Sequence, residues 1–299
     1  MPKAGIVTVV GKPNAGKSTL LNRIVGQKLS IVSPKPQSTR DRIVGIHTSE
    51  DVQFIILDTP GLLNPRYALQ ESMRATALAA LADADVILYL IDGSEDKVES
   101  LESVAALEQL PRAHVIVGIN KVDVIPKPRY EQLVERARDA TGAADVRLLS
   151  AVTGEGIEDL LAAVGALLPE SPFLYPEDDI STQTVRFFVR ELIRETALEQ
   201  LSDEVPYSVA CEIEEFREGQ TPVYIRAVLH VERESQKGIL IGAGAKRIRE
   251  IGRVARTKIE ALVGSSVYLD LRVKVLPNWR RNANALNRFG YKLPGENAS

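Results

Sequence analysis

The chain has 299 residues, 44% of them hydrophobic and 26% charged, and a formal net charge of −3 at pH 7. This length and composition are typical of a globular protein with two domains. The single cysteine, Cys211, excludes an intramolecular disulfide and a thiolate metal cage, and it fits a reducing cytosol. No apolar run approaches the roughly 18–20 residues that span a bilayer. We expect no signal peptide and no integral membrane insertion, whereas peripheral membrane contact stays open.

The charge is distributed unevenly along the chain. Residues 1–180 carry 18 Lys and Arg against 25 Asp and Glu, whereas residues 181–299 carry 19 against 15. Within the second part, residues 237–292 hold 13 basic residues and only three acidic ones. This asymmetry indicates an anionic partner for the second half of the chain.

The stretch Gly11–Ser18 fits the spacing Gly-x-x-x-x-Gly-Lys-Ser/Thr between an apolar run typical of a buried strand and the start of a helix. In such a loop the backbone N–H groups point at phosphate oxygens, and the helix N-terminus adds its positive end. Lys17 would then reach the β- and γ-phosphates, and the Ser18 hydroxyl would bind Mg²⁺. The predicted phosphate-binding residues are Gly11, Lys12, Pro13, Asn14, Ala15, Gly16, Lys17, Ser18 and Thr19.

Strand and helix patterns alternate through the first half of the chain. The apolar runs predict strands that are buried on both faces, which is typical of a parallel sheet covered by helices in an α/β fold. The expected strands are 43–48, 52–57, 85–92, 113–119 and 146–149, and the expected helices are 68–82, 98–110, 129–141 and 156–168.

Further polar residues follow the predicted strands, where such folds place their chemistry. Asp58 is positioned to hold Mg²⁺, and the Gly61 N–H can approach a γ-phosphate. The Asp123 carboxylate can accept both N1–H and the N2 amino hydrogens of guanine, a donor pair that adenine lacks. A backbone N–H at Ser150 or Ala151 can meet the guanine O6. Together with Thr59, Pro60, Leu62, Asn120 and Lys121, these residues predict a GTP-binding domain that takes GTP, GDP and Mg²⁺.

These motifs resemble the translation-factor class of P-loop GTPases. The resemblance implies that a threonine of the first switch loop binds Mg²⁺ in the GTP state; Thr39 matches it, with Ser38 as the second choice. In Ras-like relatives, the glycine that corresponds to Gly61 is followed by a glutamine, and this glutamine orients the attacking water. This chain has Leu62 at that position. Related GTPases with a hydrophobic residue there use potassium, held partly by an asparagine at the position of Asn14. We therefore expect K⁺ as a candidate cofactor, unless Asn14 only caps the loop.

Three prolines and three consecutive acids in residues 169–182 predict a linker. Beyond it, the patterns predict the order α-β-β-α-β, and hence a smaller α+β domain over residues 183–299 after a nucleotide-binding domain over 1–168. The expected elements are a helix at 185–201, whose buried candidates include Phe188, Leu192, Thr196 and Leu198, strands at 207–215 and 223–232, a helix at 245–263 and a strand at 266–275.

The helix predicted at 245–263 is amphipathic. Its apolar residues (Ile248, Ile251, Ala255, Ile259 and Leu262) recur at helical spacing, so we expect them to face a core. Its basic residues suit a nucleic-acid backbone, although a solvated charged face is the ordinary alternative. The basic face consists of Lys246, Arg249, Arg253 and Arg256.

The layout resembles a KH domain of the bacterial type, whose Ile-Gly-x-x-Gly loop clamps single-stranded RNA. The corresponding loop is Ile241–Ala245, with Gly242 as the first motif glycine. The second motif position is Ala245, whose Cβ stands where the RNA backbone should approach, and the neighbouring Gly244 could compensate.

The whole arrangement resembles the Era family of bacterial GTPases over nearly the entire chain. The distinctive local matches are Pro36–Arg40, Gly45–Thr48, Gln236–Gly242 and Asn278–Arg281. The resemblance implies a GTPase that binds the 3′ end of small-subunit ribosomal RNA in small-subunit assembly, in the cytoplasm and peripherally at the membrane. The oligomeric state stays open, with a monomer as the default expectation. Trp279 is expected to stack on a base or to anchor the core. Besides the basic helix face, the expected RNA contacts are Lys237, Gly242, Gly244, Trp279, Arg280 and Arg281.

Two other functions are weighed against a GTPase switch. The first is an RNA-binding chaperone whose nucleotide site controls affinity with negligible turnover, and Leu62 favours it. The second, an ATP-dependent metabolic kinase, is disfavoured by Asp123 and by the lack of a small-substrate motif.

Overall fold

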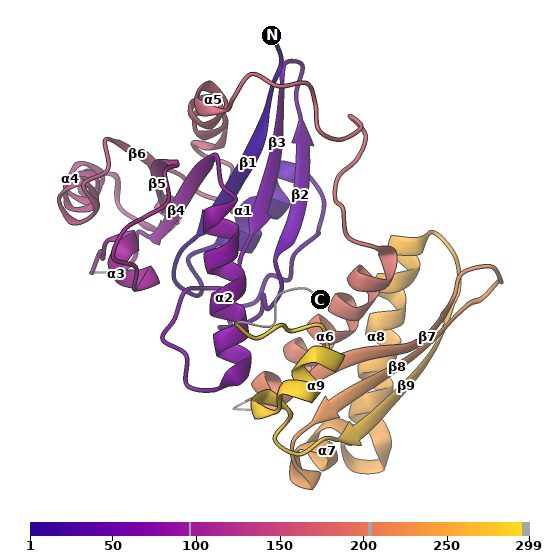
Figure 1. The fold of residues 1–299 in the computed structure, drawn as a ribbon. Coiled ribbons are helices and arrows are strands. Elements are labelled where there is room, and N and C mark those ends of the chain that lie inside the picture. Colours follow the sequence, from indigo (N-terminus) through magenta and orange to yellow (C-terminus); the bar gives the residue numbers. More distant parts are fainter. Residues whose placement is uncertain (96, 203–204, 295–299) are drawn as a thin grey trace. The chain divides into compact units, whose positions relative to one another are not determined.

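The computed structural model describes residues 1–95, 97–202 and 205–294, and the chain divides into two compact units (Figure 1). Unit 1 consists of Met1–Pro65 and Met73–Thr182, and unit 2 of Arg66–Ser72 and Gln183–Ser299. The sequence predicted a second domain up to residue 299, of which 203–204 and 295–299 lie outside the described residues. The short segment 66–72 belongs to unit 2, although the chain on both sides of it belongs to unit 1.

Unit 1 is built on a six-stranded sheet of order β2-β3-β1-β4-β5-β6. All neighbours pair in parallel except β2, which is antiparallel to β3. The expectation of an entirely parallel sheet is therefore wrong at this edge. The cause is the short connection at 49–51, where Ser49 N–H donates to Val52 O at 2.9 Å, because a parallel crossover needs a dozen or more residues. The strands are β1 Lys3–Val10, β2 Ile43–Thr48, β3 Val52–Asp58, β4 Val86–Asp92, β5 His114–Asn120 and β6 Asp145–Leu148.

Five α-helices of the described chain cover this sheet. Helix α1 packs against β2 and β3, whereas α2, α3 and α4 share an apolar cluster with β4 and β5. Helix α3 is shorter than the predicted 98–110, because Ala106 turns left-handed at φ 48° and ends it. The helices are α1 Lys17–Val25, α2 Ala68–Ala82, α3 Leu101–Ala105, α4 Tyr130–Thr141 and α5 Ile157–Leu167, with 3₁₀ turns at Val122–Val124 and Lys127–Arg129.

Unit 2 is a three-stranded sheet of order β7-β8-β9, antiparallel between β7 and β8 and parallel between β8 and β9. The sequence patterns did not predict helix α7, which lies directly before the glycine loop. The Gln236 side chain starts this helix by accepting from the N–H groups of Glu232 and Arg233 at 2.9 and 3.1 Å. The elements are α6 Val185–Gln200, β7 Ala210–Arg217, β8 Val223–Val231, α7 Glu234–Ile241, α8 Lys246–Val263, β9 Val267–Val275 and α9 Ala283–Arg288, with 3₁₀ turns at Val205–Ser208, Ala243–Ala245 and Trp279–Arg281.

The core of unit 2 lies between the sheet and the helices α6 and α8, which pack side by side (Figure 1). On α8 the predicted Ile251, Ala255 and Ile259 are fully buried, whereas Ile248 is half-buried and Leu262 is exposed. On α6 the predicted Thr196 and Leu198 are buried. The buried aliphatic row of α6, however, is Val189, Ile193 and Ala197, so Phe188 and Leu192 lie one residue out of phase.

The predicted linker, residues 169–182, forms hydrogen bonds with strands of unit 1. The Gln53 side chain accepts from Leu174 N–H at 2.8 Å and donates to Tyr175 O at 2.8 Å. Ile46 N–H donates to Ile180 O at 2.9 Å. This proline-rich segment is therefore hydrogen-bonded along β2 and β3 before the chain enters unit 2.

Candidate nucleotide and RNA sites

The phosphate-binding loop joins the carboxyl end of β1 to the first turn of α1, as its sequence predicts. Gly16 has φ 98°, and a Cβ there would lie 2.1 Å from Asn120 Nδ2, so only glycine fits. The Lys17 ammonium is buried and donates to Gly11 O at 3.1 Å and Lys12 O at 2.9 Å. Burial lowers the pKa of Lys17 to about 8, against the opposing attraction of Asp58. A buried cation on carbonyl oxygens is ready to exchange them for phosphate oxygens.

Three of the predicted metal ligands come together beside this loop. Ser18 Oγ donates to Asp58 Oδ2 at 2.7 Å and lies 2.9 Å from Thr39 Oγ1. Asp58 is fully buried, its second oxygen has no hydrogen-bond partner among the described residues, and burial raises the pKa of this carboxyl. A buried carboxylate beside two hydroxyls is a donor set of the kind that Mg²⁺ prefers, so the residues present fit that ion.

A cavity of about 320 Å³ opens over the phosphate-binding loop. Thr39, Gly61 and Lys121 line it together with the loop, so three separate segments of the predicted site face one space. Its further lining residues come from the first switch loop: Ile31, Val32, Ser33, Pro34, Gln37 and Ser38.

The base-reading residues are held together at the ends of β5 and β6. Asn120 Nδ2 donates to Ala15 O at 2.8 Å, and Asn120 Oδ1 accepts from Ala151 N–H at 2.9 Å, which ties this turn to the phosphate-binding loop. Ser150 Oγ donates to Asp123 Oδ1 at 2.6 Å. Asp123 is otherwise exposed, so its other carboxylate oxygen can face a base.

The surroundings of Leu62 and Asn14 bear on how the protein would hydrolyse GTP without a catalytic glutamine. Leu62 is 2% exposed, and its N–H donates to Gly11 O at 3.0 Å, so it belongs to the core of unit 1. Asn14 Nδ2 donates to Pro34 O at 3.0 Å, which connects the phosphate-binding loop to the first switch loop. Asn14 therefore does more than cap its own loop, and its side-chain oxygen remains an acceptor for a cation.

The sequence missed Ser30, which donates to Asp58 Oδ2 at 2.6 Å. Asn22 of α1 fixes Ser30 by accepting its N–H at 2.8 Å and donating to its carbonyl at 2.8 Å. Another missed contact is the ion pair of Lys121 with Asp92 at 2.5 Å, which fixes the lysine of the base-reading turn. No local pattern in the sequence marks either pair, because each joins residues 28 or 29 positions apart.

In unit 2 the glycine loop lies between α7 and α8. Gly242 has φ 72°, and a Cβ there would lie 2.9 Å from Arg247 Cβ. Ala245 adopts φ 59° in the left-handed region, a conformation that favours glycine. Gly244 has open space around its Cα. Ala245 therefore occupies a left-handed position of the loop in spite of its Cβ.

A groove of about 460 Å³ lies between α8 and β9. Predicted basic residues of α8 form one wall, and Gly252 leaves room between them. Strand β9 forms the other wall. The groove is lined by Ile248, Arg249, Gly252, Arg253, Arg256, Tyr268, Leu269 and Leu271.

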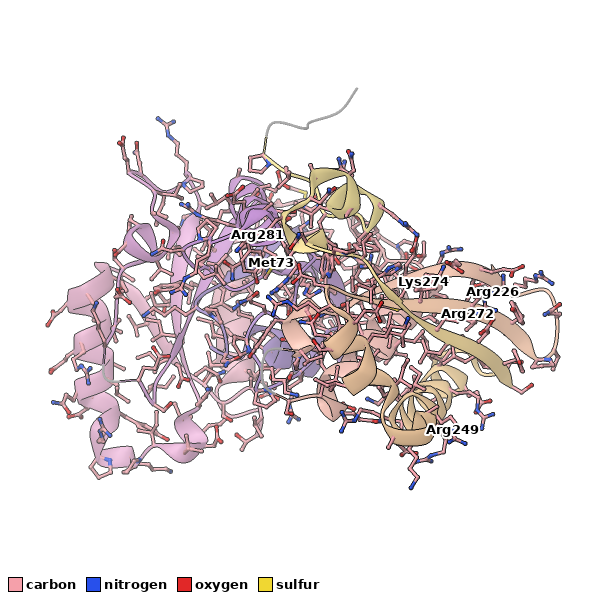
Figure 2. The ribbon with its side chains drawn as sticks, turned by 90° about the horizontal axis from the view of Figure 1, so that it is seen from below. Met73, Arg226, Arg249, Arg272, Lys274 and Arg281 are labelled. Atoms are coloured by element: carbon pink, nitrogen blue, oxygen red, sulfur yellow. The ribbon has the colours of Figure 1, made fainter. Side chains whose placement is uncertain are left out.

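The predicted RNA contacts divide into exposed and engaged residues. Lys246, Arg249, Arg253 and Arg256 are exposed along α8, and Figure 2 shows Arg249 on this helix. Arg249 Nε donates to Ala245 O at 3.1 Å, and Arg253 pairs with Glu250. The basic face of α8 is therefore accessible to an anionic ligand.

Trp279 is a core residue and not a stacking platform. It is fully buried, and its indole N–H donates to Ser208 O at 2.8 Å. Arg280 pairs with Glu232 and lies 5.1 Å from the Tyr67 ring centroid, so it too is engaged within unit 2. Arg281 is exposed, and Lys237 is half-buried and 3.8 Å from Glu234. Of these four, Arg281 alone is exposed and has a side chain without a partner within the part of the chain that the structure describes.

The fold and the sites define a P-loop GTPase domain joined to a KH domain. Residues 6–121 match the family described as 50S ribosome-binding GTPase, and residues 204–280 match the KH domain family. The chain is 40% identical over 291 residues to the GTPase Era of Carboxydothermus hydrogenoformans and to that of Geobacter sp. (strain M21), covering 97% of this chain and 98% of each relative. The chain belongs to the Era family of GTPases.

Solved structures agree with this assignment. A crystal structure of Era in complex with MgGDPNP and nucleotides 1506–1542 of 16S ribosomal RNA has a TM-score of 0.92 and 38% identity, covering 98% of this chain and all of that one. A variant of Aquifex aeolicus Era bound to GDP·AlF₄⁻ has the same TM-score and identity, covering 97% of this chain and 100% of that chain.

Replacing Ala245 with Gly is expected to stabilise the protein and to raise its affinity for RNA. Alanine at a left-handed φ costs roughly 1 kcal/mol, part of which the greater freedom of glycine in the unfolded chain offsets. We expect the free energy of unfolding to rise by up to about 1 kcal/mol, and single-stranded RNA to bind more tightly. Urea titration and RNA binding of the two proteins measure this. Gly244→Ala is the converse control: Gly244 also has a left-handed φ of 57°, so alanine there should lower the free energy of unfolding, and a gain in stability would contradict the explanation.

Proposed function

We propose that the protein is a GTPase switch that binds GTP and GDP, hydrolyses GTP, and couples the nucleotide state to binding of the 3′ end of small-subunit ribosomal RNA in small-subunit assembly. The observation that carries the proposal is the set Ser18, Thr39 and Asp58, joined by hydrogen bonds in the unit where Asn120 ties the base-reading turn to the phosphate-binding loop. Nucleotide binding is assigned to residues 1–168 and RNA binding to 183–299, with 169–182 as the connection.

The chemistry follows from the charge that develops on the phosphates, with water as the nucleophile. Lys17 stabilises charge on the β- and γ-phosphates, and the N–H of Gly61 approaches the γ-phosphate. Ser18, Thr39 and Asp58 would hold Mg²⁺, which neutralises phosphate charge when bound. No side chain acts as a base at position 62, because Leu62 is buried and has no polar atom.

The switch rests on Thr39 and Gly61, which would contact the metal and the γ-phosphate only while GTP is bound. Loss of the γ-phosphate releases both contacts, so the loops that carry Thr39 and Gly61 lose the ordered conformation that they have with GTP bound. We propose that this change alters the RNA affinity of the KH unit.

Steady-state hydrolysis tests the enzymatic part of the proposal. We expect Mg²⁺-dependent release of phosphate from GTP and not from ATP. We also expect RNA that contains the 3′ end of small-subunit ribosomal RNA to stimulate this release. A negligible rate that neither RNA nor potassium changes would instead favour an RNA-binding chaperone controlled by nucleotide, the second candidate, which the buried Leu62 supports.

Potassium is our proposal for the positive charge that a catalytic side chain would otherwise supply. We expect turnover in KCl to exceed turnover in NaCl by about tenfold, as an added charge at the phosphates would produce. Asn14→Gly keeps the left-handed φ of 65° and removes the side-chain oxygen, so the salt preference should disappear in that variant. Equal rates in both salts would contradict the proposal.

The family resemblance further implies a location in the cytoplasm with peripheral contact at the inner face of the cell membrane, and we propose the same for this chain, with a monomer as the default oligomeric state. Among the described residues, no helix is long and apolar enough to cross a bilayer. Fractionation of cells that express the tagged protein, before and after a high-salt wash, tests the peripheral location.

A further inference from the structure

A row of side chains crosses the sheet of unit 2 on the face opposite α6 and α8. The register places Arg217 of β7, Tyr224 of β8 and Tyr268 of β9 next to one another. The two tyrosine rings are nearly parallel, with centroids 5.7 Å apart and 10° between their planes. The Arg217 guanidinium carbon lies 5.2 Å from the Tyr224 centroid. This geometry is an offset stack extended by a cation–π contact.

The next row fixes the stack in place. Arg226 Nη2 donates to the Tyr224 hydroxyl at 2.8 Å, and Arg226 Nε donates to Asp270 Oδ2 at 3.1 Å. Asp270 also accepts from Arg272 at 2.8 Å. Figure 2 shows Arg226 and Arg272 along the strands. Tyr224 is therefore held between cations and a second ring, which leaves Tyr268 as the outer member of the stack.

Tyr268 belongs to two surfaces at once. It is 58% exposed, on the outermost strand of the sheet, and it also lines the groove between α8 and β9. A strand that leaves this groove past the edge of β9 would meet the Tyr268 ring next. An exposed aromatic ring braced by a second ring is a surface on which a nucleic-acid base stacks.

We propose that Tyr268 is a stacking platform for a base of single-stranded RNA adjacent to the segment held in the groove, and that Tyr224 is its positioning residue. The inference rests on the proposed RNA-binding function. It adds a contact outside the glycine loop and the basic face of α8, at a residue that sequence reasoning did not select.

The charges around the stack favour a base over a charged surface. On this face of the sheet, the neighbouring cations of the described chain are paired: Arg217 with Glu215, Arg226 and Arg272 with Asp270, and Lys274 with Glu214. An anionic membrane or an acidic protein would require cations that are not already compensated. Stacking requires only the ring, so the contribution of Tyr268 should depend little on salt.

The test compares two RNAs with the full-length protein. The first has four nucleotides, which fill a KH groove, and the second extends the same four by three on each side. For Tyr268→Ala we expect about tenfold weaker binding of the long RNA at low and at high salt, as the loss of one stacked base predicts, and less than twofold for the short RNA. Tyr268→Phe should bind like the unaltered protein. Leu262→Ala, which removes an apolar side chain that is 42% exposed and lies outside the groove lining, is the control.

The role of Tyr224 has its own readout. With 2-aminopurine at each flanking position in turn, one position should be quenched on binding to the unaltered protein and to Tyr224→Phe, and less quenched with Tyr224→Ala. Ultraviolet cross-linking of the unaltered protein should attach the long RNA at Tyr268, which tests the platform even if a variant folds poorly.

Equal binding of the long RNA by Tyr268→Ala and the unaltered protein would overturn the platform and leave the proposed function intact. Equal losses on both RNAs would also overturn it, because Tyr268 would then belong to the groove alone. Binding to vesicles of anionic phospholipid is measured beside the RNAs. If Tyr268→Ala weakened vesicle binding and left RNA binding unchanged, the platform would contact a membrane and not RNA. If the unaltered protein bound neither RNA, RNA binding as the function would itself fail.

Discussion

Asp123→Asn is expected to lower the affinity for GTP about a thousandfold and to move the base preference toward xanthine. The carboxylate accepts two guanine hydrogens, and charge-assisted hydrogen bonds contribute about 1.5–3 kcal/mol each. An asparagine amide keeps one acceptor and turns the other atom into a donor. Xanthine has a carbonyl where guanine has its amino group, so it matches that arrangement. Competition binding with GTP, XTP and ATP measures the shift.

The control for this variant is Asp139→Asn on the exposed face of α4, away from the site. The structure adds one condition, because Ser150 Oγ donates to Asp123 Oδ1 at 2.6 Å. Ser150→Ala should weaken GTP binding without changing the base preference, since it loosens the carboxylate without altering its acceptors. An Asp123→Asn protein that still preferred GTP over XTP would show that another group reads the base.

Lys17→Met is expected to reduce the rate of GTP hydrolysis by about 10²–10³-fold, the usual loss when one preorganised group opposite developing charge is removed. The ammonium already lies inside the phosphate-binding loop, on the carbonyls of Gly11 and Lys12. Methionine keeps the length of the side chain and removes the charge. Single-turnover hydrolysis separates this effect from nucleotide binding. Lys127→Met, at an exposed lysine, is the control, and an unchanged rate for Lys17→Met would remove Lys17 from the mechanism.

The pH dependence of binding has a definite sign at this residue. The free protein holds Lys17 at a pKa of about 8, because burial disfavours the charged form. Bound phosphates favour the charged form, so they raise this pKa toward or above its ordinary value. Nucleotide binding should therefore take up a proton as the pH rises through about 8, and affinity should fall there. Calorimetry in buffers of different ionisation enthalpy should show this uptake, and Lys17→Met should lack it.

The nucleotide site could be predicted from the sequence because its parts lie in short motifs after recognisable strands. The glycine spacing at Gly11–Ser18 and the polar residues after β3 and β5 place the chemistry at one edge of a parallel sheet. Ser30 and Asp92 could not be found in this way, because each reaches its partner through the folded chain. The antiparallel β2 was missed for a related reason: apolar runs predict burial and do not give strand direction.

In unit 2 the sequence predicted the basic helix and the position of the glycine loop better than the surfaces around them. Trp279 resembles a stacking residue in the sequence, and only the contact of its indole with Ser208 shows that it is core. Tyr268 resembles an ordinary outward residue of an alternating strand. Its stacking on Tyr224 depends on the register between β8 and β9, which a single sequence does not specify.

The most direct test of the coupled switch is the RNA affinity of the full-length protein in its two nucleotide states. The protein is loaded with GDP or with a non-hydrolysable GTP analogue and titrated at fixed salt with the 3′ end of small-subunit ribosomal RNA and with a scrambled strand. We predict tighter, sequence-selective binding with the analogue. Equal, weak and salt-sensitive binding in both states would contradict the coupling and leave only a GTPase beside a nonspecific basic surface.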